Sequence, residues 1–179
     1  MNLVSEIKNL ETRFAAGDIL GLRELSKEAA IEAYVNNEPS LVELGVISYS
    51  CAKFLEKHYI VSSSEWNSFK ESLLRLLAQA RVNYSENNVE RGRSFMHSAI
   101  ILVEGLSSSI GRFASSVIEK GRIKIGADMY ARGASLGIAS TLSGVDKKEL
   151  GEYIGITRIL EKYSTKNVSE RMSEFKKLV

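Results

Sequence analysis

Few residues of this 179-residue chain could do metal or nucleophilic chemistry. Its histidines are His58 and His97, and its one cysteine is Cys51. None of them stand at the short spacing of a zinc site, so we expect no bound metal and no cofactor. Phosphate-binding glycine loops, dinucleotide-binding motifs and serine-nucleophile motifs are missing from the sequence as well. Cys51 and His58 share a helical face, but we interpret Cys51 as a small buried thiol.

Arg91 and His97 form the pair of residues that best suits catalysis without a metal. They occur in NVERGRSFMHSAIILVEGL, residues 88–106, with five residues between them. A guanidinium can hold a phosphate, and an imidazole can move a proton near neutral pH. The spacing resembles the Arg-x4–6-His motif of the HEPN family, helical domains of which many are metal-independent ribonucleases, although Gly92 stands where that family often has a polar residue. The resemblance implies that Arg91 holds the scissile phosphate while His97 moves the 2′-hydroxyl proton, across a dimer.

Basic residues are dense between positions 112 and 132. They are Arg112, Lys120, Arg122, Lys124 and Arg132, and three of them belong to or adjoin the GRIKIG segment, residues 121–126. Lys120, Arg122 and Lys124 have Glu119 as their one close acid. Such a surface can follow a phosphate backbone without reading its sequence. The alternative is a helix C-terminus at Gly121, whose flanking cations interact with the helix dipole.

The stretch IASTLSGVDKKELGEYIGITRI, residues 138–159, has the pattern of a helix-turn-helix. An apolar helix runs to Gly144, the chain turns, and Asp146 begins a second helix as its N-cap. The second helix would present Lys147 and Lys148 to a phosphate backbone. Its acidic residues oppose a polyanion, and it has no arginine or asparagine placed for base contact. We therefore expect any polyanion to bind at the GRIKIG segment rather than at this hairpin.

The same hairpin carries a second resemblance. Residues 144–159 read G-V-x-x-x-E-L-x-x-Y-I-G-x-T-x-I, and a basic tail follows them. This run is similar to short C-terminal helical segments of uncharacterised archaeal proteins, including PIN-containing DNA-binding proteins. The parallel sheet and clustered acids of a PIN nuclease are not in this sequence. The resemblance therefore implies work on nucleic acid or in an RNA-processing complex, without that nuclease activity.

The elements that must position these residues are predicted to be helices throughout. The chain has a single proline, Pro39, and no Asn-Gly or Asp-Gly hairpin turn. Apolar residues recur at helical spacing, and the clearest predicted helices cover residues 3–14, 19–36, 39–58, 122–143, 146–154 and 167–178. We expect helix ends at Gly17, Asn37 and Gly121, and a loop at residues 83–88. Gly126, Gly133 and Gly137 are predicted to let a neighbouring backbone come close, and residues 41–55 to be the most buried helix.

Composition indicates an all-α multi-helix bundle of ordinary globular character. Hydrophobic residues make up 44% and charged residues 26% of the chain. We expect a bundle at residues 1–143 with a C-terminal helical appendage at 144–179 packed on it, or one domain throughout. The first residues alternate charge and apolar character, so we expect no signal peptide, and no apolar stretch is long enough for a bilayer. A lone cysteine is typical of a reducing compartment, so we expect a cytoplasmic protein.

Three functions are consistent with these patterns. The leading hypothesis is a non-catalytic binding or adaptor protein whose partner is RNA, DNA or another protein. The first alternative is a HEPN-like metal-independent ribonuclease that uses Arg91 and His97. The second is a structural homo-oligomer such as a homodimer, because Leu3, Ile7, Leu10 and Phe14 form a heptad-like stripe.

Overall fold

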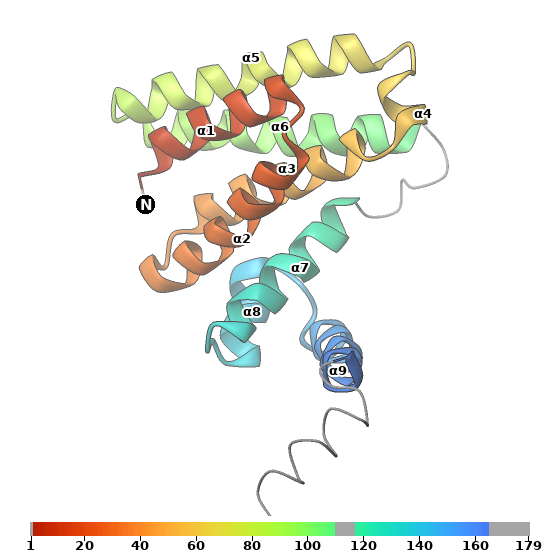
Figure 1. The fold of residues 1–179 in the computed structure, drawn as a ribbon. Coiled ribbons are helices and arrows are strands. Elements are labelled where there is room, and N and C mark those ends of the chain that lie inside the picture. Colours follow the sequence, from red (N-terminus) through yellow and green to blue (C-terminus); the bar gives the residue numbers. More distant parts are fainter. Residues whose placement is uncertain (1, 110–116, 165–179) are drawn as a thin grey trace, which may run out of the picture.

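The computed structural model describes residues 2–109 and 117–164, and the regular structure of these residues is all α-helix. This confirms the predicted all-α bundle. In Figure 1, α1, α5 and α6 lie together at one side of the bundle, α2 and α3 follow, and α7, α8 and α9 form the other side. The helices are α1 (Leu3–Ala16), α2 (Ile19–Asn36), α3 (Pro39–Leu55), α4 (His58–Val61), α5 (Trp66–Ser85), α6 (Val89–Ser109), α7 (Val117–Ala131), α8 (Leu136–Ser143) and α9 (Lys147–Ser164).

The first helix boundaries follow from capping chemistry. Gly17 has a φ of 71°, which a glycine adopts without steric cost, and it ends α1. Asp18 begins α2, because its Oδ1 accepts a hydrogen bond of 2.9 Å from the backbone N–H of Gly21. Asn37, with a φ of 50°, ends α2, and Pro39 is the first residue of α3. The predicted ends at Gly17 and Asn37 are confirmed.

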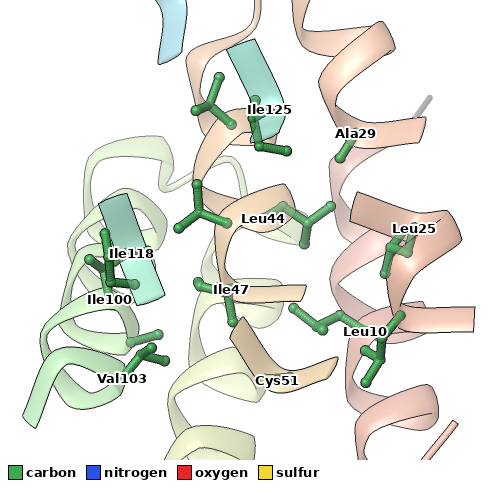
Figure 2. Packing of buried hydrophobic residues seen from close by; sticks show 14 of the residues in the cluster. Leu10, Leu25, Ala29, Leu44, Ile47, Cys51, Ile100, Val103, Ile118 and Ile125 are labelled. Carbon is green, nitrogen blue, oxygen red and sulfur yellow. The ribbon is translucent and has the colours of Figure 1, made fainter. Parts of the chain in front are cut away.

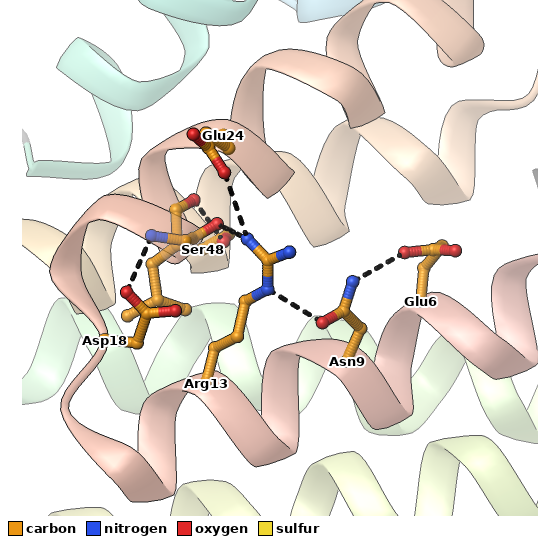
Figure 3. Close-up of polar contacts among 8 residues, drawn as sticks. Glu6, Asn9, Arg13, Asp18, Glu24 and Ser48 are labelled. Atoms are coloured by element: carbon orange, nitrogen blue, oxygen red, sulfur yellow. Dashed lines mark hydrogen bonds and ion pairs between the residues drawn. The ribbon is translucent and has the colours of Figure 1, made fainter.

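Arg13 joins α1 to α2 (Figure 3). Its Nε donates to Asn9 Oδ1 over 2.8 Å, and its Nη1 donates to the carbonyl of Gly21 in the first turn of α2. Glu24 Oε2 lies 3.8 Å from the same Nη1. A Cβ at Gly21 would lie 2.1 Å from Asp18 Oδ2 and 2.7 Å from Arg13 Nη1, so a larger residue at this position would displace both the capping carboxylate and the guanidinium.

The α3 helix forms the centre of the molecule, as predicted. It contacts α1, α2, α6, α7 and α8 in addition to its neighbour α4. Leu44, Ile47 and Cys51 have no solvent exposure, and Figure 2 shows them between side chains of α1 and α2 and side chains of α6 and α7. Its buried serines are satisfied, because Ser48 Oγ donates to the Leu22 carbonyl over 2.8 Å and Ser50 Oγ to the Val46 carbonyl over 2.8 Å.

Three predicted boundaries are wrong. The helix predicted at residues 146–154 continues in α9 to Ser164. The other two errors concern α7. Residues 122–143 do not form one helix, because α7 ends at Ala131 and Gly133 turns the chain with a φ of 114°. Ser135 then caps α8, accepting a hydrogen bond of 3.2 Å from the Ile138 N–H. Gly121 is not a helix end, since it lies inside α7.

The predicted loop at residues 83–88 is shorter than expected. The α5 helix continues to Ser85, because Asn83 Nδ2 donates to the Gln79 carbonyl over 2.8 Å and Ser85 Oγ to the Val82 carbonyl over 2.7 Å. These side chains bond to their own helix instead of ending it.

Of the three glycines predicted to allow close packing, only Gly126 does so. A Cβ there would lie 2.8 Å from Ser143 Oγ and 3.1 Å from the Leu150 side chain, so α7 approaches α8 and α9 at this point. Gly133 instead forms the turn after α7, and a Cβ at Gly137 would meet nothing closer than 3.9 Å.

The predicted hairpin at Gly144 is confirmed. Gly144 ends α8 with a φ of 71°, and Asp146 Oδ1 accepts hydrogen bonds from the N–H groups of Lys148 at 2.8 Å and Glu149 at 3.2 Å. Leu150 and Ile154 of α9 are buried in the same hydrophobic cluster as the N-terminal helices.

The basic tail and the helix predicted at residues 167–178 lie outside the described residues, and the division of the chain at residue 144 stays a prediction. None of the described helices combines the length and the hydropathy that crossing a bilayer requires.

Candidate functional site

The cations around the GRIKIG segment have different surroundings. Arg112 lies outside the described residues. Arg122 Nη1 donates over 3.2 Å to the Ser143 carbonyl at the C-terminus of α8, and Lys124 Nζ lies 2.6 Å from Asp128 Oδ1. The expectation that Glu119 is the only acid near these cations is therefore wrong for Lys124. Lys120 is exposed in the first turn of α7 and has no ion pair with any described residue.

The remaining predicted cations are exposed, and the two in the hairpin have acidic neighbours. Arg132 follows the last residue of α7, and Lys147 and Lys148 occupy the first turn of α9. Asp146 and Glu149 flank these lysines directly.

A concave site lies where α3, α4, α6 and α7 meet, and we call it the lysine–tyrosine pocket. Its volume is about 290 Å³. Phe54, Ile60 and Val117 supply apolar surface. Three lysines line the same pocket: Lys53 from α3, Lys57 from the turn before α4 and Lys120 from α7. None of the described lining residues is acidic. The lining consists of Tyr49, Lys53, Phe54, Lys57, Tyr59, Ile60, Ser107, Val117 and Lys120.

The charged groups in and beside this pocket have a net positive charge. Lys53 Nζ lies 5.7 Å from the centre of the Tyr49 ring and 3.1 Å from Glu56 Oε2. Glu56 also accepts from Arg23, so one carboxylate serves two cations. Burial raises the pKa of Glu56, but the hydrogen bonds and charges of Lys53 and Arg23 outweigh it and hold that pKa below its ordinary value. The Glu56 carboxylate is therefore ionised at neutral pH. Lys53 and Arg23 carry two positive charges against its one negative charge, so the three groups together are positively charged.

Tyr49 forms a neutral aromatic wall. Burial, and secondarily Tyr153 and Glu56, raise the pKa of the Tyr49 phenol above its ordinary value, so the ring carries no charge at physiological pH. Gly121 of α7 makes room for this ring, because a Cβ there would lie 3.3 Å from Tyr49 Cδ1 and 3.3 Å from Val46 Cγ1. The glycine that the sequence suggested as a helix end thus allows α7 to pack against α3.

A second concavity, which we call the acidic cleft, adjoins this pocket and shares Ser107 and Val117 with it. It has a volume of about 460 Å³ and lies between the end of α6, the start of α7 and the α8–α9 turn. Its charged lining residues are Glu104, Glu119, Asp146, Glu149 and Arg122. One face of this region is therefore basic and the adjoining face is acidic.

Arg91 and His97 do not converge within one molecule. Both are exposed on α6, but six positions along a helix separate them by about 120° around its axis. Gly92 is buried against the Tyr84 ring, where a Cβ would lie 2.9 Å from Cδ2. Packing therefore explains the glycine at this position.

His97 instead lies near Glu43 of α3, as do Arg93 and Arg122. Glu43 is half-buried, and its Oε2 is inaccessible and has no hydrogen-bond partner among the described residues. Burial raises the pKa of this carboxyl, and His97, Arg122 and Arg93 only partly offset that effect.

We expect Glu43→Gln to stabilise the protein at neutral pH. Because the pKa of Glu43 is raised in the folded state, its charge lowers stability above the folded pKa, and this cost disappears as pH falls toward the ordinary value of 4.5. Urea unfolding across this pH range should show a difference between variant and wild type that shrinks toward acid. Glu28→Gln, at an exposed position, is the control with no such dependence. A variant less stable than wild type at neutral pH would show that attraction to the cations outweighs burial.

Cys51 is fully buried, and burial raises the pKa of its thiol. His58 is exposed at the start of α4. The interpretation of Cys51 as a small buried thiol is confirmed.

Most residues of the lysine–tyrosine pocket were not predicted from the sequence. Tyr49, Lys53 and Lys57 recur at intervals of four residues and would share one side of the helix predicted at residues 39–58, although α3 ends at Leu55. The residues around them are typical of a buried core. Lys120 was the one residue of this pocket that charge density indicated. Comparison of the chain with protein-family models, with curated proteins and with solved structures finds no match.

Proposed function

We propose that this chain is a non-catalytic binding protein for single-stranded nucleic acid and that the lysine–tyrosine pocket is its binding site. Lys53, Lys57 and Lys120 would contact phosphates, and one base would enter the pocket and stack on Tyr59 or Tyr49. Aromatic stacking combined with a basic groove is the usual way in which proteins hold single strands.

The observation that carries this proposal is the convergence of three lysines on an apolar, aromatic concavity without an acidic lining residue. The buried apolar floor of the pocket suits a flat base, and the lysines attract the negatively charged phosphates of the same strand. The volume of about 290 Å³ is at the lower end of ligand pockets, which suits one base rather than a larger ligand.

A single strand fits this surface better than a duplex. The bases of a duplex are stacked inside it and cannot enter a pocket, whereas a single strand exposes them. The α8–α9 hairpin would have to contact the groove of a duplex. Its lysines lie beside Asp146, Glu149 and the acidic cleft. Negative charge at that position repels a phosphate backbone.

The ribonuclease alternative remains a separate prediction. It requires Arg91 of one molecule and His97 of another to meet across a dimer, because one molecule does not bring them together. Cleavage of RNA without metal, abolished by His97→Ala, would select it over the binding function.

Tyr59→Ala tests the role of the pocket in stacking. Loss of one base–aromatic stack should cost about 1–3 kcal/mol, so the dissociation constant for a labelled oligothymidine should rise by roughly 5- to 150-fold in a fluorescence anisotropy titration. Tyr59 is 44% exposed, so the truncation should change stability little. Tyr59→Phe keeps the ring and should bind nearly as well as wild type. Equal affinity of Tyr59→Ala and Tyr59→Phe would contradict stacking at this residue.

A further inference from the structure

Arg23 of α2 lies beside the lysine–tyrosine pocket, one carboxylate away from Lys53. Its Nη2 donates to Glu56 Oε1, and Lys53 Nζ lies 3.1 Å from Glu56 Oε2. The guanidinium and the ammonium are therefore bound to the two oxygens of the same carboxylate. Because Lys53 lines the pocket, Arg23 marks the edge of the pocket that faces α2.

The Arg23 side chain has donors left for a ligand. A guanidinium carries five N–H groups. Glu56 accepts from Nη2, and neither Nε nor Nη1 of Arg23 donates to another residue in the described part of the chain. The side chain is 49% exposed, so these groups face solvent. An accessible guanidinium with unused donors is a common contact for a nucleic-acid phosphate.

The charge beside the pocket differs between its two sides. Toward α2, Arg23 and Lys53 carry two positive charges against the one negative charge of Glu56. Toward the α8–α9 turn, the pocket adjoins the acidic cleft, whose lining has four carboxylates and one arginine. A phosphate backbone would be attracted on the α2 side and repelled over the cleft.

We propose that a single strand with one base in the pocket continues toward α2, where Arg23 contacts one of its phosphates, and does not cross the acidic cleft. This inference rests on the proposed function, because it gives the path of the strand beyond the base that the pocket holds. It makes Arg23 a binding residue in a part of the chain, residues 19–36, that the density of basic residues did not indicate.

Arg23→Gln tests the phosphate contact in an anisotropy titration with labelled oligothymidine at several salt concentrations. We expect weaker binding and a slope of log affinity against log salt that is smaller by about 0.7, the share of one phosphate contact. Arg23→Lys keeps the charge and should keep the slope. The matched control is Arg75→Gln, which removes the same charge from an exposed position of α5 outside the pocket. A wild-type slope in Arg23→Gln would overturn the contact.

The double variant Glu104→Gln, Glu149→Gln tests the path of the strand. If the strand avoids the cleft, these carboxylates are largely screened from it beyond about 8 Å at physiological salt, and affinity should change by less than about threefold. If the strand crosses the cleft, removing two repulsive charges should tighten binding by more than about tenfold, which would overturn the proposed path.

These outcomes are distinguishable from a failure of the proposed function. Weaker binding by Tyr59→Ala together with an unchanged slope in Arg23→Gln would keep the pocket and reject Arg23 as part of the site. A smaller slope in Arg23→Gln together with wild-type affinity in Tyr59→Ala would support the phosphate contact and reject stacking at Tyr59. No binding of oligothymidine to the wild-type chain at low salt would reject both.

Discussion

Replacing Leu44 with alanine is expected to lower the free energy of unfolding by about 2–5 kcal/mol. Leu44 has no solvent exposure. In Figure 2 it lies on α3 with Leu25 and Ala29 of α2 on one side, Ile100 of α6 on the other and Ile125 of α7 above it. Removing its branched end leaves a cavity that neighbours on several helices would have to close, because α3 contacts most of the other described helices. Urea unfolding followed by circular dichroism measures the loss.

Leu20→Ala is the matched control for this change. Leu20 belongs to α2 but is 70% exposed, so the same truncation removes little buried surface and should change stability by less than about 0.5 kcal/mol. Similar losses for both variants, or a loss below about 1 kcal/mol for Leu44→Ala, would contradict the central place of α3.

Helix boundaries were predictable from the sequence where local chemistry decides them. Gly17 followed by Asp18 and Asn37 followed by Pro39 are local signals, because a left-handed residue and a cap act within a few positions. The burial of α3 was predictable for a similar reason, since a helix that is apolar nearly all round has to lie inside. The hairpin at Gly144 was predictable for the same reason, because a glycine and a capping aspartate act locally.

The break between α7 and α8 was missed although its residues carry a signal. Gly133 and Ser135 are a turn glycine and an N-cap serine, but a continuous apolar pattern on both sides favoured one helix. The misplaced helix end at Gly121 has a different cause. Its glycine accommodates Tyr49, which is 72 positions earlier in the chain, and a contact at such a separation has no local signal.

In the candidate site, too, local contacts were predictable from the sequence and long-range contacts were not. The ion pair of Lys124 with Asp128 is a local pair four positions apart on one helix, and it could have been inferred. The bond from Arg122 to the Ser143 carbonyl depends on the packing of α7 against α8. The lysine–tyrosine pocket joins residues 49–60 to Ser107, Val117 and Lys120, so only the folded chain brings its lysines together.

The most direct test of the proposed function is the salt dependence of single-strand affinity. In the triple variant Lys53→Gln, Lys57→Gln, Lys120→Gln, we expect weaker binding of a labelled oligothymidine and a slope of log affinity against log salt that is smaller by about 2, because each lost phosphate contact accounts for roughly 0.7. The control Lys8→Gln, Lys147→Gln, Lys148→Gln removes the same charge from exposed positions outside the pocket and should keep the wild-type slope. Equal slopes for all three proteins, or no wild-type binding at low salt, would contradict the lysine–tyrosine pocket as a nucleic-acid site.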